Sequence, residues 1–181
     1  MGIVQLVLVR HGRAGTKEGW AGDDRRRPLD ARGRRQAMHI ADVVAPLRPD
    51  RILSSPSDRC IQTMEPLAAE LGIPIEEGAD LTPNAAHGAL ALVRSLSTPG
   101  SSDQGSSDQG SSGQGSSDQG SSGTVVLCTH GEVIGVVLAA LAAADGIRLP
   151  RRPPGLKGCV WVIEFRQGRV VSARYIAPAR L

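Results

Sequence analysis

The seven residues from Leu6 to Gly12 read Leu-Val-Leu-Val-Arg-His-Gly. Four apolar residues stop at two basic ones, and a glycine follows. A short apolar run of this kind indicates a buried strand, because helices cover both faces of a parallel sheet. In open α/β sheets, ligands bind just beyond the carboxyl ends of the strands. We therefore expect Arg10 and His11 at such an edge, with Gly12 allowing a tight turn and close backbone approach.

Composition narrows the class of protein. The chain has 181 residues, enough for one domain with a sizeable core, and is 40% hydrophobic but only 2% aromatic. No membrane-spanning run or signal-type segment is recognisable, which predicts a cytoplasmic protein without membrane contact. The net charge of +3 is too small, and aromatic residues are too few, to indicate nucleic-acid binding. The three cysteines form no CxxC pair and are predicted to be buried thiols: Cys60, Cys128 and Cys159.

Hydrophobic periodicity predicts alternating strands and helices along the chain. The expected fold is a three-layer α/β/α sandwich with a mostly parallel central sheet and a C-terminal antiparallel hairpin. Asp30 is expected to cap the first helix, and Gln167-Gly168 to form the turn of the hairpin. After the first strand we expect strands at 51–55, 73–75, 125–127, 158–165 and 169–176, and helices at 30–45, 58–71, 85–96 and 132–144.

Residues 100–123 differ from the rest of the chain. They repeat Ser-Ser-Asp-Gln-Gly, with Gly in place of Asp in one copy, and contain no apolar residue. Such a segment cannot offset the entropy lost on ordering, and a five-residue period is too short for a solenoid unit. The sequence therefore predicts one domain over 1–181, interrupted by a disordered insertion at 100–123.

Polar residues follow three of the predicted strands. Arg10 and His11 follow the first, Ser54-Ser55-Pro56 follows the second with Arg59 in the next helix, and His130 follows the strand at 125–127. Two guanidinium groups and two imidazoles converging at one sheet edge suit a phosphoryl group, because guanidinium groups bind its oxygens in fork geometry. A neutral imidazole can also attack phosphorus as a nucleophile.

These motifs resemble the histidine phosphatase superfamily. Leu-Val-Arg-His-Gly, Ser-Ser-Pro-x-x-Arg-x-x-Gln-Thr and a later strand ending in His-Gly occur in the same order, and the likeness covers the chain outside the repeat. The segments around Arg27-Pro28-Leu29 and Asp80-Leu81-Thr82-Pro83 look most like SixA-type phosphohistidine phosphatases. The stretch from Gln62 to Ala68 also looks like the phosphatase domain attached to some Nudix hydrolases.

The resemblance implies a role for each matching residue. His11 becomes phosphorylated, Arg10 and Arg59 bind the phosphoryl oxygens, and His130 completes the pocket and stabilises the transition state. No metal or other cofactor is implied, since the arginines supply the positive charge. Many relatives carry a glutamate as proton donor where this chain has Pro83. Asp80 and Glu132 are the nearest candidates for a general acid, although Glu132 also fits a helix-capping role.

The expected function is a metal-independent phosphatase acting through a phosphohistidine on His11. Its predicted substrate is a phosphorylated protein carrying phosphohistidine, or another phosphoramidate. Two alternatives stay open: a phosphatase of small phosphate monoesters such as nucleotides or sugar phosphates, and a phosphate-binding regulatory module without turnover. The oligomeric state is not predicted. Arg25, Arg26 and Arg27 are either a solvated loop face or a basic rim that attracts an anionic substrate.

Overall fold

The computed structural model describes residues 3–98, 123–149 and 155–179. Within these ranges, six strands form one sheet in the order β3-β2-β4-β1-β5-β6. Strands β1, β2, β3 and β4 run parallel, whereas β5 pairs antiparallel with both β1 and β6. The strands are β1 (Ile3–Arg10), β2 (Arg51–Ser54), β3 (Ile75–Glu77), β4 (Thr124–Thr129), β5 (Val160–Arg166) and β6 (Arg169–Ile176).

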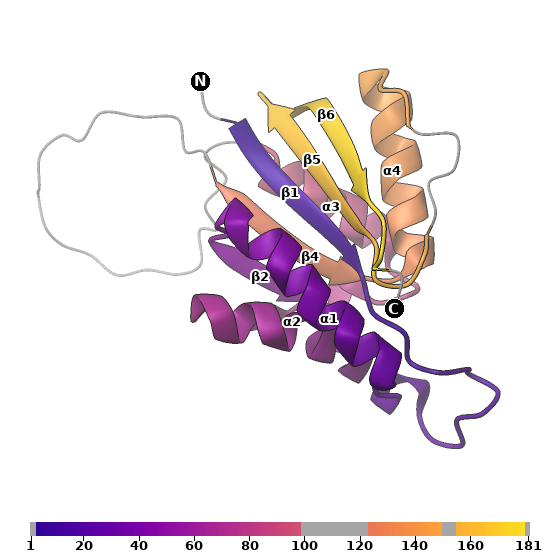
Figure 1. Ribbon diagram of the computed structural model, residues 1–181. Helices are drawn as coiled ribbons and strands as arrows, with labels where there is room; N and C mark the ends of the chain where they lie inside the picture. The colour runs from indigo at the N-terminus through magenta and orange to yellow at the C-terminus, as the bar shows by residue number, and fades with distance from the viewer. Residues whose placement is uncertain (1–2, 99–122, 150–154, 180–181) are drawn as a thin grey trace, which may run out of the picture.

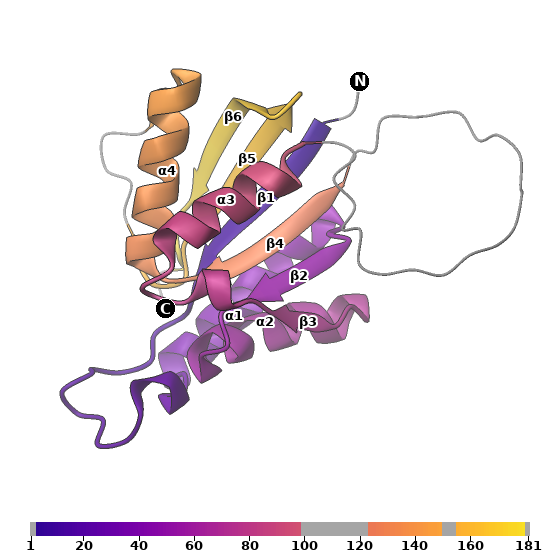
Figure 2. The same cartoon turned by 180° about the vertical axis from the view of Figure 1, so that it is seen from behind.

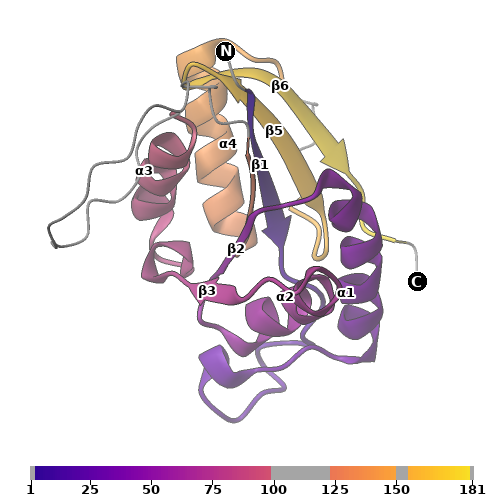
Figure 3. The same ribbon diagram turned by 90° about the vertical axis from the view of Figure 1, so that its left-hand side faces the viewer.

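Helices cover both faces of this sheet. Helices α1 (Ala31–Val44) and α2 (Asp58–Leu71) lie on one face, and α3 (Ala86–Leu96) and α4 (Gly131–Asp145) lie on the other (Figures 1 and 2). The side view in Figure 3 separates the three layers. A hydrophobic core lies between the sheet and the helices on each face. Alternate residues of β1 point into these two cores: Leu6 and Leu8 pack on the α3/α4 side, and Val7 and Val9 on the α1/α2 side. The predicted α/β sandwich with its C-terminal hairpin is thus confirmed.

The third strand lies two residues later than predicted. We expected residues 73–75, but β3 begins only at Ile75. Gly72 ends α2 with a left-handed conformation, and the Ile73 amide bonds back to the Ala68 carbonyl. Pro74 has no N–H to donate to a ladder, so pairing with β2 starts after it. In the hairpin, Gln167 and Gly168 both have positive φ, as a two-residue turn between twisted strands requires.

Close backbone contacts hold the loop after β1 against α1. Asp30 caps α1 as predicted, because its carboxylate accepts a hydrogen bond from the Gly33 amide. A Cβ on Gly33 would overlap the carbonyl oxygen of Arg13, and one on Gly12 would lie 2.8 Å from the carbonyl oxygen of Gly33. Both positions need glycine for this approach, which brings the loop beyond His11 to the start of α1.

Several predicted features lie outside the described residues. They include the repeat at 100–123 apart from Gly123, so its disorder and its effect on domain organisation stay predictions. No helix in the described ranges is long and apolar enough to cross a membrane. The three cysteines are buried and free, as expected.

Candidate active site

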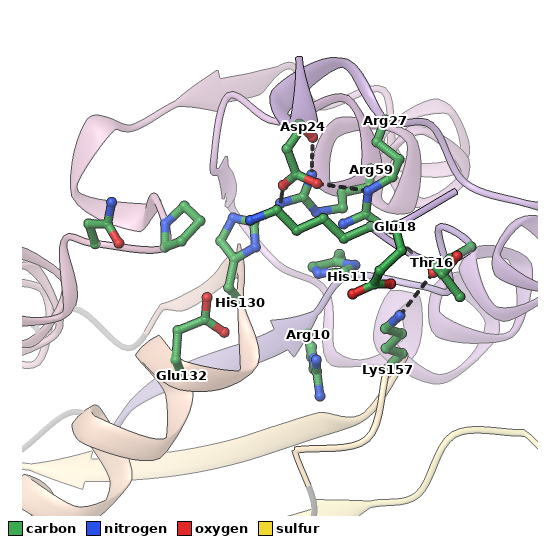
Figure 4. Close-up of a pocket in the computed structure, with 14 residues that line it drawn as sticks. Arg10, His11, Thr16, Glu18, Asp24, Arg27, Arg59, His130, Glu132 and Lys157 are labelled. Carbon is green, nitrogen blue, oxygen red and sulfur yellow. Dashed lines mark hydrogen bonds and ion pairs between the residues drawn. The ribbon is translucent and has the colours of Figure 1, made fainter. Parts of the chain in front are cut away.

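A cavity of about 670 Å³ opens at the carboxyl ends of β1 and β4. Arg10 and His11 reach it from the end of β1, His130 from the junction of β4 and α4, and Arg59 from the first turn of α2 (Figure 4). The structure therefore brings together the four residues that the motifs singled out. Three more cations line the same cavity: Lys17, Arg27 and Lys157.

The ring of His11 is held in one tautomer. Its Nδ1 lies 2.7 Å from the carbonyl oxygen of Gly12, and because a carbonyl can only accept, Nδ1 carries the proton. In the neutral ring, Nε2 therefore keeps its lone pair. Burial lowers the pKa of His11 well below 6.5, outweighing the Gly12 bond, and the charges of His130, Arg59 and Arg10 lower it further. His11 is thus a neutral imidazole with an available nitrogen over a wide pH range.

This low pKa predicts a stability change with pH. The unfolded chain takes up a proton on His11 near pH 6.5, whereas the folded chain does so only at much lower pH. Stability from neutral His11 is therefore complete above pH 6.5 and decreases as pH falls toward the folded pKa. Below pH 6.5, the free energy of unfolding should fall by up to about 1.4 kcal/mol per pH unit more steeply than in His11→Asn.

Chemical denaturation of both proteins between pH 5 and 8 measures this difference. The His11→Asn variant retains the other acidic and basic groups, so their titration cancels in the comparison. Plotted against pH, the free energies of unfolding of the two proteins should run parallel above pH 6.5 and diverge below it. Parallel curves over the whole range would contradict the low pKa of His11.

His130 lies beside His11, with ring centroids 5.2 Å apart and an edge-on angle of 64°. Its Nε2 is 3.0 Å from the hydroxyl of Ser55, which follows β2, and 3.7 Å from the thiol of Cys60. These groups orient the ring, which is only 2% exposed. Within the Ser-Ser-Pro motif, Ser55 is therefore the residue whose hydroxyl holds the His130 ring in place.

The two predicted phosphate-binding arginines have buried donors available. The Nε atoms of Arg10 and Arg59 are buried and have no hydrogen-bond partner among the described residues. The guanidinium of Arg10 lies so close to Gly131 that a Cβ there would approach its Cζ to 2.7 Å. Because an unsatisfied buried donor is costly, both groups are suited to an anion that enters the cavity.

Asp24 and Arg27 belong to this site, although only Arg27 appeared among the sequence candidates. Asp24 forms ion pairs with Arg59 at 3.1 Å and with Arg27 at 2.9 Å. Partial burial alone would raise the pKa of Asp24, but the Arg27 hydrogen bond and the Arg59 charge hold it below its usual range. Arg27 is buried, whereas Arg25 and Arg26 are exposed, so only one arginine of the three faces inward.

Asp24 was missed because it lies in an irregular loop. The segment between β1 and α1 contains only one short 3₁₀ turn, η1 (Asp24–Arg26). Only tertiary packing turns this segment back over α2, where the Asp24 carbonyl also accepts a hydrogen bond from Arg59 at 2.5 Å. The one local signal was an acidic pair, Asp23-Asp24, next to three arginines.

Two polar side chains of α2 hydrogen-bond to the backbone next to the site residues. Thr63 on α2 accepts a hydrogen bond from the Gly12 amide at 3.0 Å and donates to the Arg59 carbonyl at 2.6 Å. Gln62 accepts from the Leu29 amide at 2.8 Å. The Gln-Thr pair of the motif therefore ties α2 to both ends of the segment between β1 and α1, which carries His11 and Asp24, rather than lining the cavity.

The two candidate acids lie in different places. Asp80 is exposed on the short turn η3 (Ala79–Leu81), near Gly88, and is not part of the cavity wall. Glu132, in the first turn of α4, does line the cavity, on the His130 side in Figure 4. Pro83 also lines it, as does Glu18, which the sequence did not single out. Of the two sequence candidates, only Glu132 can meet a substrate here.

Two arginines and two histidines that meet at the carboxyl ends of parallel strands can bind a phosphoryl group. Residues 6–83 match the model of the histidine phosphatase superfamily (branch 1). This match confirms the resemblance seen in the motifs of the chain. The 8-oxo-(d)GTP phosphatase of Mycolicibacterium smegmatis is 32% identical over 175 residues. That match covers 96% of this chain but 48% of the relative, so the chain spans about half the relative's length.

Solved structures share the fold at low sequence identity. SixA from Agrobacterium tumefaciens is 23% identical, with a TM-score of 0.65 over 97% of this chain and 99% of that one. The protein histidine phosphatase SixA complexed with tungstate is 20% identical, with a TM-score of 0.66 over 96% and 95%. A mycobacterial glucosyl-3-phosphoglycerate phosphatase is 18% identical, with a TM-score of 0.62 over 96% and 97%. These similarities concern the fold.

Proposed function

We propose that the protein is a phosphatase in which Nε2 of His11 is the nucleophile. A bond forms between Nε2 and phosphorus while the bond from phosphorus to the leaving group breaks. Water then attacks the phosphohistidine, the P–N bond breaks, and inorganic phosphate leaves. The observation that carries this proposal is the lone pair of His11 Nε2 in the same cavity as the buried, unpartnered donors of Arg10 and Arg59.

Fixed cations supply the charge stabilisation in this proposal. Arg10 and Arg59 bind the equatorial oxygens of the transferred group, and Asp24 holds the Arg59 guanidinium in place. His130, oriented by Ser55, donates a hydrogen bond to the same oxygens. Such an arrangement needs no metal ion to neutralise the developing charge.

Two substrate classes fit the proposed mechanism. A phosphoramidate such as protein phosphohistidine suits a site with Pro83 in the place of a proton donor, because imidazole leaves easily, with a conjugate acid of pKa about 6.5. A small phosphate monoester is the second candidate. Glu132 favours it, since this carboxyl lines the cavity and can protonate an alkoxide. The similarity to an 8-oxo-(d)GTP phosphatase also supports a small substrate.

A comparison of specificity constants tests these candidates. We expect a larger kcat/KM for a phosphohistidine peptide than for an alkyl phosphate, because a missing general acid costs about 100- to 10,000-fold with a poor leaving group. Asp80→Asn should change neither constant and serves as the control for Glu132→Gln. Equal constants in the wild type, with a selective loss on the alkyl phosphate in Glu132→Gln, would reject the phosphoramidate and establish Glu132 as the acid.

A further inference from the structure

Lys157 is a cation in the wall of the cavity. It lines the same cavity as His11 and is half-buried. Its Nζ contacts the carbonyl oxygen of Gly15 at 3.4 Å, and no carboxylate of the described residues forms an ion pair with it. Figure 4 shows its side chain directed toward the loop that contains Thr16. Neither the sequence motifs nor the proposed chemistry assigns it a role.

The backbone around Lys157 is fixed against the catalytic strand. The carbonyl of Lys157 accepts a hydrogen bond at 3.0 Å from the side chain of Gln36, whose Oε1 in turn accepts one from the Arg13 amide. The next amide, of Gly158, donates to the carbonyls of both Arg10 and His11 at 3.1 Å. Gln36 itself is 5% exposed. Lys157 is therefore held at a set position relative to the nucleophile, unlike a lysine on a free surface.

Lys157 also stands among other positive charges. Burial lowers the pKa of its amine, and the charges of Arg10, Arg27 and Arg13 lower it further. The charge of Asp30 acts in the opposite direction on Lys157, whereas Asp24 forms its ion pairs with Arg27 and Arg59. The chemistry proposed above assigns Arg10 and Arg59 to the phosphoryl group that is transferred and leaves Lys157 without an assigned anion. An ammonium group binds phosphate well as a point charge.

We propose that Lys157 is a specificity-determining residue that binds a second phosphoryl group, next to the one that His11 receives. The substrate class is then a nucleoside diphosphate or a similar diphosphate. This inference rests on the phosphatase function proposed above. In the step, the bond between the terminal phosphorus and the bridging oxygen breaks, and that oxygen leaves on the nucleoside monophosphate. Because a phosphate monoester has a second pKa of about 6, this leaving group needs no strong acid, which agrees with Pro83 in the cavity wall.

The test compares guanosine diphosphate with p-nitrophenyl phosphate, which has one phosphoryl group, using the full chain. For guanosine diphosphate, Lys157→Ala should raise KM about tenfold to 100-fold, the size of a lost charged hydrogen bond, with little change in kcat. For p-nitrophenyl phosphate, KM should change less than about twofold. Lys157→Arg, which keeps the charge, should recover most of the loss. Arg32→Ala, an exposed arginine of α1 outside the cavity, is the matched control.

The outcomes separate this inference from the proposed function. If the wild type hydrolyses neither of these compounds nor a phosphohistidine peptide, the phosphatase proposal fails. If it hydrolyses only the phosphohistidine peptide, the substrate class is wrong and the phosphatase proposal stands. If it hydrolyses p-nitrophenyl phosphate but not guanosine diphosphate, the substrate class is wrong. If Lys157→Ala affects both compounds equally, or neither, then Lys157 does not select for a second phosphoryl group, and the phosphatase assignment stands.

Discussion

Replacement of His11 by alanine is expected to lower kcat/KM by about 10,000-fold or more, because the variant lacks the nitrogen that receives the phosphoryl group. The fold should survive. The ring is neutral, so its removal leaves no unpaired charge, and the lost hydrogen bond to the Gly12 carbonyl costs about 1–3 kcal/mol. Steady-state phosphate release and thermal unfolding measure the two effects separately.

Rapid quenching identifies the intermediate itself. Wild-type protein mixed with labelled substrate should trap phosphate that is labile in acid and stable in base, as expected of a phosphohistidine, and His11→Ala should trap none. His87→Ala is the control, since His87 is an exposed histidine on α3 outside the cavity wall. An acid-stable adduct, or normal turnover by His11→Ala, would be incompatible with His11 as the nucleophile.

Replacement of Arg59 by alanine should lower kcat/KM about 100- to 1000-fold, the usual effect of removing one fixed donor from a developing anion. Its effect on stability should be modest. The Arg59 side chain is only 4% exposed and pairs with Asp24, but Asp24 keeps its second ion pair, to Arg27, when Arg59 is lost. We therefore expect the melting temperature to fall by only a few degrees.

Arg26→Ala is the matched control for this variant. Arg26 lies in η1 near Arg59, but its side chain is 75% exposed and pairs with Asp58 at 3.6 Å. Its removal should leave turnover within about twofold, because exposed ion pairs contribute little. Arg59→Lys should recover only part of the activity, since a lysine lacks the planar fork of a guanidinium. A large loss of stability in Arg59→Ala with normal turnover would show that the ion pair between Arg59 and Asp24 is structural.

Much of the fold was predictable because its signals are local. The apolar run before Arg10, the cap at Asp30 and the Gln167-Gly168 turn each depend on a few adjacent residues, and each is found where the sequence placed it. The error at β3 is local too: an apolar pair at Ile73 and Ile75 suggested a strand, but Pro74 between them delays pairing. Because parallel strands share one edge for their carboxyl ends, the order of elements also predicted which side chains would meet.

Local sequence signals were therefore enough to predict the layered fold and the convergence of Arg10, His11, Arg59 and His130 on one cavity. The protonation of these groups and the contacts that hold them depend instead on long-range packing. Asp24 reaches Arg59 across 35 positions of sequence, and Lys157 is anchored by Gln36 across 121. Contacts between residues so far apart in the sequence produce no local pattern from which they could be predicted. The low pKa of His11 has the same origin, because desolvation depends on every element that packs around the ring.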